Sequence, residues 1–220
     1  MLTEETTHGA ALNSLSLPSP GGGDNSVDIS PQQRDAALIG FLIETYRSEF
    51  ATDESERQRL SVTITRHIDA LKSALGDLEN ARGLRVLDVA CGSRDCAGNR
   101  QGTFDPWMSR LLHHLGAQPL GLDIAPQRDE RFESRVVDLT RPGALDFLGA
   151  HSIDAYYVFG FPNSATLEAI DRQGLSWESV RDSIESALQV ALRPTGKVIR
   201  GFTAENERWI RDARARLSSQ

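Results

Sequence analysis

The chain has 220 residues, of which 39% are hydrophobic and 25% charged, and its formal net charge is −7. This length suits one α/β domain with a small appendage. The negative charge is concentrated in residues 1–83, with 7 Lys and Arg against 13 Asp and Glu, whereas residues 84–220 hold 17 against 18. A protein that follows a nucleic-acid backbone needs a basic face, so this balance argues against a nucleic-acid partner.

Cysteine usage and the start of the chain bear on the compartment. Cys91 and Cys96 are the two cysteines, too few for a disulfide framework, which favours a reducing environment. Residues 1–30 contain no apolar run long enough for a secretory signal or a membrane span. The expectation is a soluble cytoplasmic protein without a membrane partner.

The N-terminal third predicts a tail and two helices. Residues 1–30 are rich in Pro, Gly and Ser and poor in apolar side chains, so we expect a disordered segment. Ser30 followed by Pro31 predicts a helix start. Apolar residues recur at helical spacing on both sides of a Thr52-Asp53 break, which predicts two helices within residues 31–83. We interpret residues 31–83 as a helical lid, with β-branched residues 62–65 permitting a kink.

Residues 84–220 alternate between strand and helix patterns and predict an α/β domain. Apolar runs predict strands over residues 85–90, 119–124, 134–138, 153–159 and 197–202. Caps and helical periodicity predict helices over residues 105–115, 142–148, 176–192 and 205–217, with Asp105 as the N-cap of the first. The expected fold is a Rossmann-like, doubly wound, mostly parallel sheet of five strands ordered 3-2-1-4-5.

Three acids end three successive predicted strands: Asp88, Asp123 and Asp138. In such a sheet, ligands bind outside the carboxyl ends of the strands, where the strand order reverses. A carboxylate after the second strand can accept both hydroxyl protons of a ribose. An acid after the third strand is placed to accept from the exocyclic amine of a base.

Five short segments, in this order, resemble class I S-adenosylmethionine-dependent methyltransferases: Val-Leu-Asp-Val-Ala-Cys-Gly-Ser, Gly-Leu-Asp-Ile-Ala-Pro, Val-Val-Asp-Leu, Ile-Asp-Ala-Tyr-Tyr-Val-Phe and Leu-Arg-Pro-Thr-Gly-Lys-Val. The likeness covers about residues 84–202. It implies S-adenosylmethionine as cofactor and methyl transfer as the activity. The chain departs from the family in ending one predicted helix after the fifth strand, so the terminal antiparallel pair of strands is expected to be absent. The fifth strand would then be an edge that a homodimer could cover.

The resemblance also implies roles for individual residues. Asp88 and Gly92 would shape the methionine end of the pocket, Asp123 would hold the ribose, and Asp138 with Leu139 would meet the adenine. Ala90 and Ile124 belong to the same motifs and count with the cofactor-binding residues. Three residues at and after the end of the fourth strand complete the assignment. Phe159 is assigned to the cofactor, and Phe161 and Asn163 to the acceptor.

Several residues admit a second interpretation. Asp88 could instead satisfy backbone N–H groups of its turn, and Asn163 lies in a Pro-Asn pair that is ordinary turn chemistry. Cys91 is better explained as a small buried residue than as a nucleophile. Arg94 replaces the third glycine of the family's turn, and beside a sulfonium it would have to point at the methionine carboxylate or pair with Asp95.

Other enzyme classes fit less well. From Gly92 the sequence lacks the Gly-x-Gly-x-x-Gly of nicotinamide dehydrogenases, and no arginine stands six residues after either cysteine, as a cysteine phosphatase requires. No metal ligands occur at suitable spacing. The hypothesis is therefore S-adenosylmethionine-dependent methyl transfer to a small molecule, with no general base identified. The alternative is a non-catalytic scaffold of the same fold that has lost its cofactor.

Overall fold

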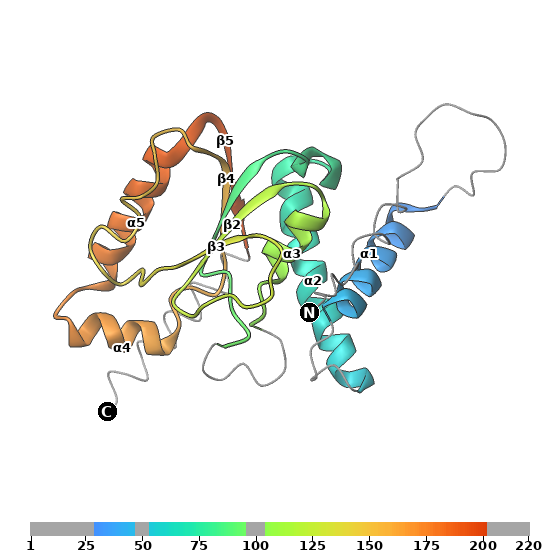
Figure 1. Ribbon diagram of the computed structural model, residues 1–220, viewed down its shortest axis with the longest axis horizontal. Coiled ribbons are helices and arrows are strands. Elements are labelled where there is room, and N and C mark those ends of the chain that lie inside the picture. The colour runs from blue at the N-terminus through green and yellow to red at the C-terminus, as the bar shows by residue number, and fades with distance from the viewer. Residues whose placement is uncertain (1–28, 47–52, 96–103, 202–220) are drawn as a thin grey trace, which may run out of the picture.

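The computed structural model describes residues 29–46, 53–95 and 104–201. In these residues five parallel strands form one sheet in the order β3-β2-β1-β4-β5 (Figure 1). The strands are β1 (Arg85–Val89), β2 (Gln118–Asp123), β3 (Glu133–Val136), β4 (Ile153–Val158) and β5 (Leu192–Arg200). The predicted Rossmann-like fold and its strand order are confirmed.

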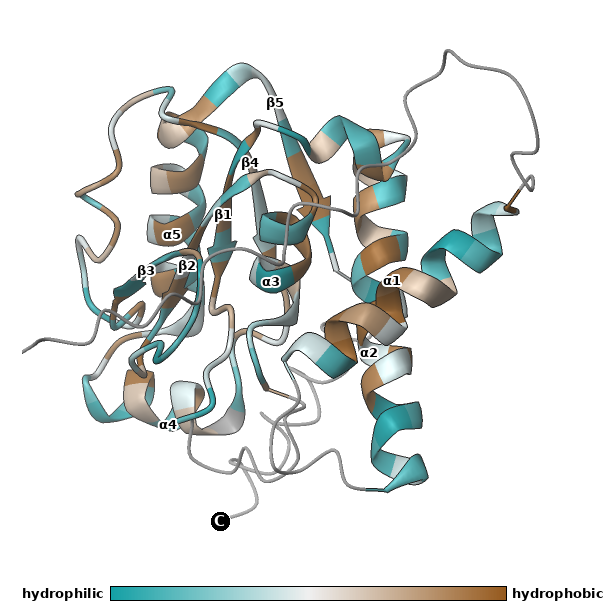
Figure 2. Ribbon diagram, turned by 45° about the vertical axis from the view of Figure 1, so that its right-hand side comes forward, coloured by the Kyte–Doolittle hydropathy of each residue, from teal (hydrophilic) through white to brown (hydrophobic). Residues whose placement is uncertain are grey.

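One face of the sheet is covered by α2 (Glu54–Leu75) and α3 (Trp107–His114), and the 3-10 turn η1 (Leu78–Ala81) leads into β1 (Figure 1). The helix α1 (Pro31–Thr45) packs against α2. A single buried cluster joins these helices to the sheet: Leu42, Leu60, Ile64, Ile68, Leu71, Leu111, Val86, Ala155, Tyr157 and Ile199 are among its members. Figure 2 shows the brown, hydrophobic side of α2 turned toward α1 and the sheet. The two N-terminal helices therefore share one core with the α/β domain.

The N-terminal helices begin where the sequence predicts. Ser30 caps α1 with a capping box, in which its hydroxyl accepts from the Gln33 N–H and the Gln33 side chain accepts from the Ser30 N–H. Asp53 caps α2. The α2 helix is continuous through residues 62–65, where Thr63 and Thr65 donate their hydroxyls to carbonyls four residues earlier.

The opposite face is covered by α4 (Ser164–Arg172), α5 (Trp177–Ala191) and the segment between β3 and β4 (Figure 1). Ser176 caps α5 as predicted, whereas α4 was not predicted. The predicted helix over residues 142–148 is wrong, because this segment is a series of turns with i to i+3 hydrogen bonds. Gly143 lies there at φ +71°, a left-handed conformation that ends regular helix.

Two further predictions require correction. Asp105 does not cap α3: the cap position is Pro106, without a side-chain hydrogen bond, and the Asp105 carboxylate binds Arg110 instead. Strand β5 begins at Leu192, directly after α5, and its pairing with β4 shifts register between Ile153 and Ala155. Residues 193–196, which lie between the predicted helix and the predicted strand, thus belong to β5 and form an irregularity in its pairing with β4.

Other expectations fall outside the described residues. The predicted disorder of residues 1–30, apart from Ile29 and Ser30, and the predicted helix over residues 205–217 both lie there. In the described part of the chain, no helix has the length and apolarity to span a bilayer. The same residues contain no group of three His, Cys, Asp or Glu side chains that could hold a metal ion.

Candidate functional site

The turn after β1 lies at the carboxyl edge of the sheet and has an unusual backbone. Ala90 and Gly92 both have positive φ, at +56° and +87°. A Cβ on Gly92 would lie 2.0 Å from the carbonyl oxygen of Phe104. Glycine is therefore required at position 92 both for its conformation and for the close approach of the returning chain.

Asp123 ends β2 beside this turn, as predicted. Its Oδ2 accepts from the Gly92 N–H at 2.9 Å, and its Oδ1 accepts from the Ala125 N–H at 3.1 Å. The side chain is buried, with 7% of the residue exposed. The carboxylate thus faces the glycine turn, while the next residue, Ile124, is an apolar side chain left 68% exposed at the same edge.

Asp88 lies on the neighbouring strand and is the penultimate residue of β1. It pairs in register with Gly121 of β2 and Tyr157 of β4, and its Oδ2 accepts from the Ser109 hydroxyl at 2.7 Å. Burial raises the pKa of Asp88 to about 7, the Ser109 hydrogen bonds lower it in part, and the charge of Asp123 raises it further. Asp88 therefore supports α3 through Ser109 and adds a carboxyl that is readily protonated beneath the turn.

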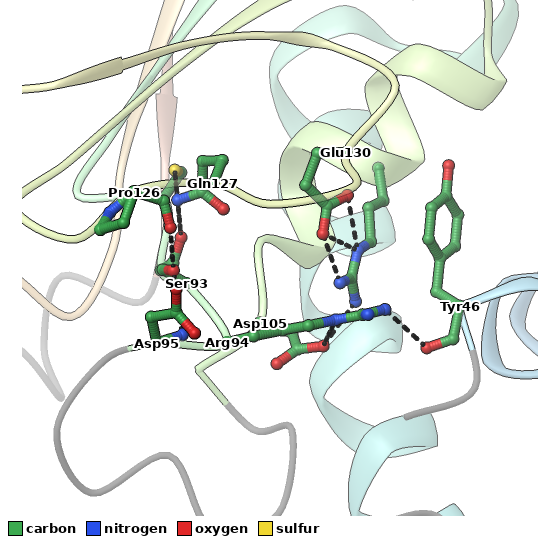
Figure 3. Close-up of polar contacts among 11 residues, drawn as sticks. Tyr46, Ser93, Arg94, Asp95, Asp105, Pro126, Gln127 and Glu130 are labelled. Atoms are coloured by element: carbon green, nitrogen blue, oxygen red, sulfur yellow. Dashed lines mark hydrogen bonds and ion pairs between the residues drawn. The ribbon is translucent and has the colours of Figure 1, made fainter. Parts of the chain in front are cut away.

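Further hydrogen bonds join the glycine turn to the loop after β2. The Ser93 hydroxyl donates to the Pro126 carbonyl at 2.7 Å, and the Gln127 side-chain amide donates to the Gly92 carbonyl at 2.5 Å. Figure 3 shows the bonds made by Ser93 and Gln127. With the bond from Gly92 to Asp123, the ends of β1 and β2 are connected in three places. The turn and the loop form one rigid floor at this edge.

Arg94 extends from the turn toward α1 and α3 (Figure 3). Its Nε lies 3.5 Å from Asp105 Oδ2, and its guanidinium donates to the Tyr46 carbonyl at 3.5 Å. Asp95, the partner considered from sequence, forms its ion pair with Arg128 instead, at 2.9 Å. The Arg94 guanidinium is therefore held at the end of α1.

Arg110 is a fully buried cation next to Arg94 that was not predicted from the sequence. Its guanidinium donates to Asp105 at 2.8 Å and to Glu130 at 2.6 Å, and it lies 4.7 Å from the ring centroids of both Tyr46 and Trp107. One side chain thus joins α1, α3 and the loop after β2. An arginine within the otherwise apolar face of residues 107–112 was the available signal.

Asp138 follows β3 as predicted, and its carboxylate is engaged locally. Oδ1 accepts from the Thr140 N–H at 3.1 Å and from the Thr140 hydroxyl at 2.6 Å, and Oδ2 accepts from Arg141 Nε at 3.0 Å. Burial raises the pKa of Asp138, but the bonds from Thr140 and Arg141 outweigh burial and lower it overall. Leu139 is buried in the core beneath this turn. An adenine contact for either residue stays a prediction.

Phe159, Phe161 and Asn163, which were predicted to form part of the site after β4, do not lie together. Phe159 packs on the α2 side, 5.5 Å from the ring of His67, whereas Phe161 packs on the other side, 5.7 Å from Trp177. Asn163 caps α4 through a 2.9 Å bond from the Thr166 N–H. This cap is the turn chemistry considered as the alternative, and acceptor binding by Phe161 and Asn163 stays a prediction.

A buried polar pair lies behind the site. His67 Nδ1 of α2 is hydrogen-bonded to the Tyr157 hydroxyl of β4 at 2.8 Å. Burial lowers the pKa of His67 to about 4, and burial also raises the pKa of Tyr157. At neutral pH both groups are uncharged, so they serve packing between α2 and the sheet.

Two surface hollows adjoin the segment between β3 and β4. One lies between this segment and α5 and is lined in part by Leu145, Ile184 and Val190. The other lies at the end of α4 and is lined by Asp138, Arg141, Pro142, Ala169, Arg172 and Gln173. Among the described residues, the second hollow reaches Asp138, and neither borders Gly92 or Asp123.

Comparisons with known proteins place solved methyltransferases beside this chain. Neither a protein-family model nor a curated protein matches its sequence. It is similar to the Burkholderia thailandensis 1,6-didemethyltoxoflavin-N1-methyltransferase, solved with 1,6-didemethyltoxoflavin and S-adenosylhomocysteine, at 15% identity and a TM-score of 0.38 over 82% of this chain and 66% of that one.

Two other solved structures are similar at comparable levels. One is the MycE methyltransferase of the mycinamycin biosynthetic pathway, in complex with Mg and S-adenosylhomocysteine, at 18% identity and a TM-score of 0.38 over 73% of this chain and 35% of that one. The other is the methyltransferase CalH in complex with S-adenosylhomocysteine, at 13% identity and a TM-score of 0.34 over 76% of this chain and 47% of that one. The chain spans about half or less of the length of these two proteins. The fold class defined here rests on strand order: a doubly wound, Rossmann-like sheet with its acids at the carboxyl edge.

Proposed function

We propose that the protein binds S-adenosylmethionine and transfers its methyl group to a small-molecule acceptor. The observation that carries this proposal is the 2.9 Å hydrogen bond between Gly92 N–H and Asp123 Oδ2. It puts a buried carboxylate at the end of β2 directly beside a glycine turn at the end of β1. This is the position at which open α/β sheets bind the ribose of a nucleotide.

The neighbouring residues fit the other parts of the cofactor. Ile124 offers an exposed apolar surface next to Asp123, suited to the flat face of an adenine. Asp88 is 1% exposed and bonds Ser109 beneath the turn, so it would shape the methionine end through the turn rather than by touching the ligand. The five motifs that resemble the methyltransferase family fall on the five observed strands in the expected order: three at the carboxyl ends of β1, β2 and β3, the fourth along β4 and the fifth at the start of β5. An acid, an apolar side chain and the glycine turn would thus lie against the ribose, the adenine and the amino-acid end of the cofactor, respectively.

The chemistry that the cofactor supplies when bound is an electrophilic methyl group on a sulfonium. The residues of this chain would act by binding and orienting, because in-line displacement gains much of its rate from positioning. Asp123 would hold the ribose, and the rigid floor of Gly92, Ser93 and Gln127 would fix where the methionine end lies. His67 and Tyr157 are too deeply buried to reach an acceptor, being 5% and 2% exposed. Neither His67 nor Tyr157 would therefore act as a base toward the acceptor.

Isothermal titration calorimetry with S-adenosylmethionine tests the proposal. We expect the wild type to bind and Asp123→Asn to bind about 10- to 100-fold more weakly, since bonds to a charged acceptor contribute about 1.5–3 kcal/mol. Asp182→Asn is the matched control, because Asp182 is an exposed carboxylate on α5 with a 65% exposed side chain. Absence of binding by the wild type, or equal affinities of wild type and Asp123→Asn, would refute the proposal.

The second candidate is a non-catalytic scaffold of the same fold. It is favoured by Arg94, a cation at the glycine turn whose guanidinium contacts Asp105 and the Tyr46 carbonyl. The two candidates differ in a thermal melt, because a ligand that binds the folded state raises the melting temperature. A melting temperature that does not move at saturating S-adenosylmethionine or S-adenosylhomocysteine would select the scaffold.

A further inference from the structure

Arg94 occupies a fixed position beside the proposed cofactor site. Its backbone follows Gly92, which is bound to Asp123, and Ser93, which is bound to Pro126. Ser93 is 1% exposed, so the chain cannot shift at this point without breaking a buried contact. The side chain of Arg94 therefore starts from a rigid base at the carboxyl edge of the sheet.

The guanidinium of Arg94 is held far more loosely than that of its neighbour. Its contacts with Asp105 and with the Tyr46 carbonyl are both at 3.5 Å, longer than an ordinary hydrogen bond. Arg110, in contrast, bonds the same Asp105 oxygen at 2.8 Å and Glu130 at 2.6 Å. Asp105 thus keeps its close partner whether or not Arg94 is present.

Exposure separates the two arginines as well. The side chain of Arg94 is 38% exposed, whereas that of Arg110 is fully buried. A guanidinium carries five N–H donors, two of which can bind one carboxylate in parallel. Two long contacts occupy little of this capacity, so Arg94 can turn its donors to a carboxylate that enters from solvent.

The charges around the turn suit a zwitterionic ligand. Asp123 places an acid on the β2 side of the turn. Arg94 places a cation on the side of α1 and α3, as Figure 3 shows. The amino-acid tail of S-adenosylmethionine carries an ammonium and a carboxylate on one carbon. An arginine at the position of the family's third glycine supplies the charge that the carboxylate needs.

We infer that Arg94 binds the carboxylate of the amino-acid tail of S-adenosylmethionine. This inference rests on the proposed function. On ligand entry the guanidinium leaves its long contacts with Asp105 and Tyr46 and forms charge-assisted hydrogen bonds to the ligand, while Arg110 keeps Asp105 paired. Arg94 then discriminates between ligands that have the carboxylate and ligands that lack it.

The test compares two ligands against three proteins by calorimetry. The ligands are S-adenosylmethionine and decarboxylated S-adenosylmethionine, which keeps the adenosine, sulfonium and amine. The proteins are the wild type, Arg94→Gln and the control Arg128→Gln, since Arg128 is a 75% exposed arginine whose ion-pair partner is the next residue after Arg94. We expect Arg94→Gln to lose about 10- to 100-fold in affinity for the intact cofactor and less than about twofold for the decarboxylated one.

The outcomes separate this inference from the proposed function. Wild-type binding of S-adenosylmethionine with equal losses for both ligands in Arg94→Gln, or with no loss for either, would overturn the role of Arg94 and leave the function standing. A wild type that binds neither ligand would overturn both. Partial recovery of carboxylate discrimination in Arg94→Lys would add support, because a lysine keeps the charge without the paired donors. The thermal melts of the variants report whether each one is folded.

Discussion

Two buried ionisable side chains, His67 and Asp88, affect the pH dependence of folding stability in opposite directions. The pKa of His67 falls from 6.5 to about 4 in the folded protein, and the pKa of Asp88 rises from 3.8 to about 7, burial being the largest cause of both shifts. Both side chains are 5% exposed or less. Between about pH 4 and 6.5 the folded state therefore keeps a proton on Asp88 and none on His67, whereas the unfolded chain does the reverse.

The signs follow from proton linkage. For His67 the unfolded state binds more protons in this range, so stability rises with pH and is lost as pH falls toward 4. For Asp88 the folded state binds more protons, so stability is present at low pH and is lost as pH rises toward 7. At about 1.4 kcal/mol per pKa unit, the two effects amount to about 3 kcal/mol for His67 and about 4 kcal/mol for Asp88. They nearly cancel in the wild type.

Substituting either residue should leave the effect of the other on the pH dependence of stability unopposed. We expect His67→Gln to gain about 3 kcal/mol relative to the wild type as pH falls from 7 to 4, because glutamine can accept from the Tyr157 hydroxyl and does not titrate. Asp88→Asn should gain about 3 kcal/mol relative to the wild type as pH rises from 4 to 7, since part of the full effect lies outside this range. The contributions of all other groups cancel in these differences.

Urea unfolding followed by tryptophan fluorescence, at half-unit steps from pH 4 to 7, measures the free energy of unfolding of each protein. The m-values of the variants should match that of the wild type, so that the differences report stability alone. A curve for His67→Gln that runs parallel to the wild-type curve over this range would refute the reasoning for His67. A parallel curve for Asp88→Asn would do the same for Asp88.

Three other substitutions have expected effects on stability, each measured by thermal or urea unfolding. Gly92→Ala should be the most severe, costing more than about 3 kcal/mol through its positive φ and its clash with the Phe104 carbonyl, whereas Gly174→Ala, also at positive φ but with open space around it, should cost about 1 kcal/mol. Arg110→Met should cost about 3–5 kcal/mol, because it leaves two buried carboxylates without their cation; a loss below 1 kcal/mol would contradict this assignment. Asn163→Ala should cost about 1 kcal/mol by removing the α4 cap and Asn163→Asp almost nothing, so equal losses in the two variants would argue against capping.

The strand order could be predicted because each strand carries its own signal. Apolar runs, flanking caps and turn residues fix the five strands locally, and the rules for crossover connections then allow few arrangements. The bond between Gly92 and Asp123 follows from that order, since neighbouring parallel strands end at one edge. The fold and the position of Asp123 beside Gly92 were thus predictable to the extent that local pattern and topology determine them.

The interpretations that failed depend on contacts between distant segments. Asp105 has the sequence context of a helix cap, but the buried guanidinium of Arg110 attracts its carboxylate more strongly than the backbone does. Glu130 and Tyr46 complete that cluster from a loop and a helix remote in sequence. No local pattern reveals such a meeting. The absence of a helix over residues 142–148, in contrast, was foreseeable from Gly143.

The hydrogen bonds that join the turn after β1 to the loop after β2 make one backbone amide a natural reporter. The N–H of Gly92 donates to the carboxylate that the proposed ribose would contact. Any ligand that draws on this carboxylate must change the shielding and the hydrogen-exchange rate of that single amide. Ligand binding at the proposed cofactor site can therefore be followed at the resonance of one glycine amide, before the acceptor is known and without an assay of turnover.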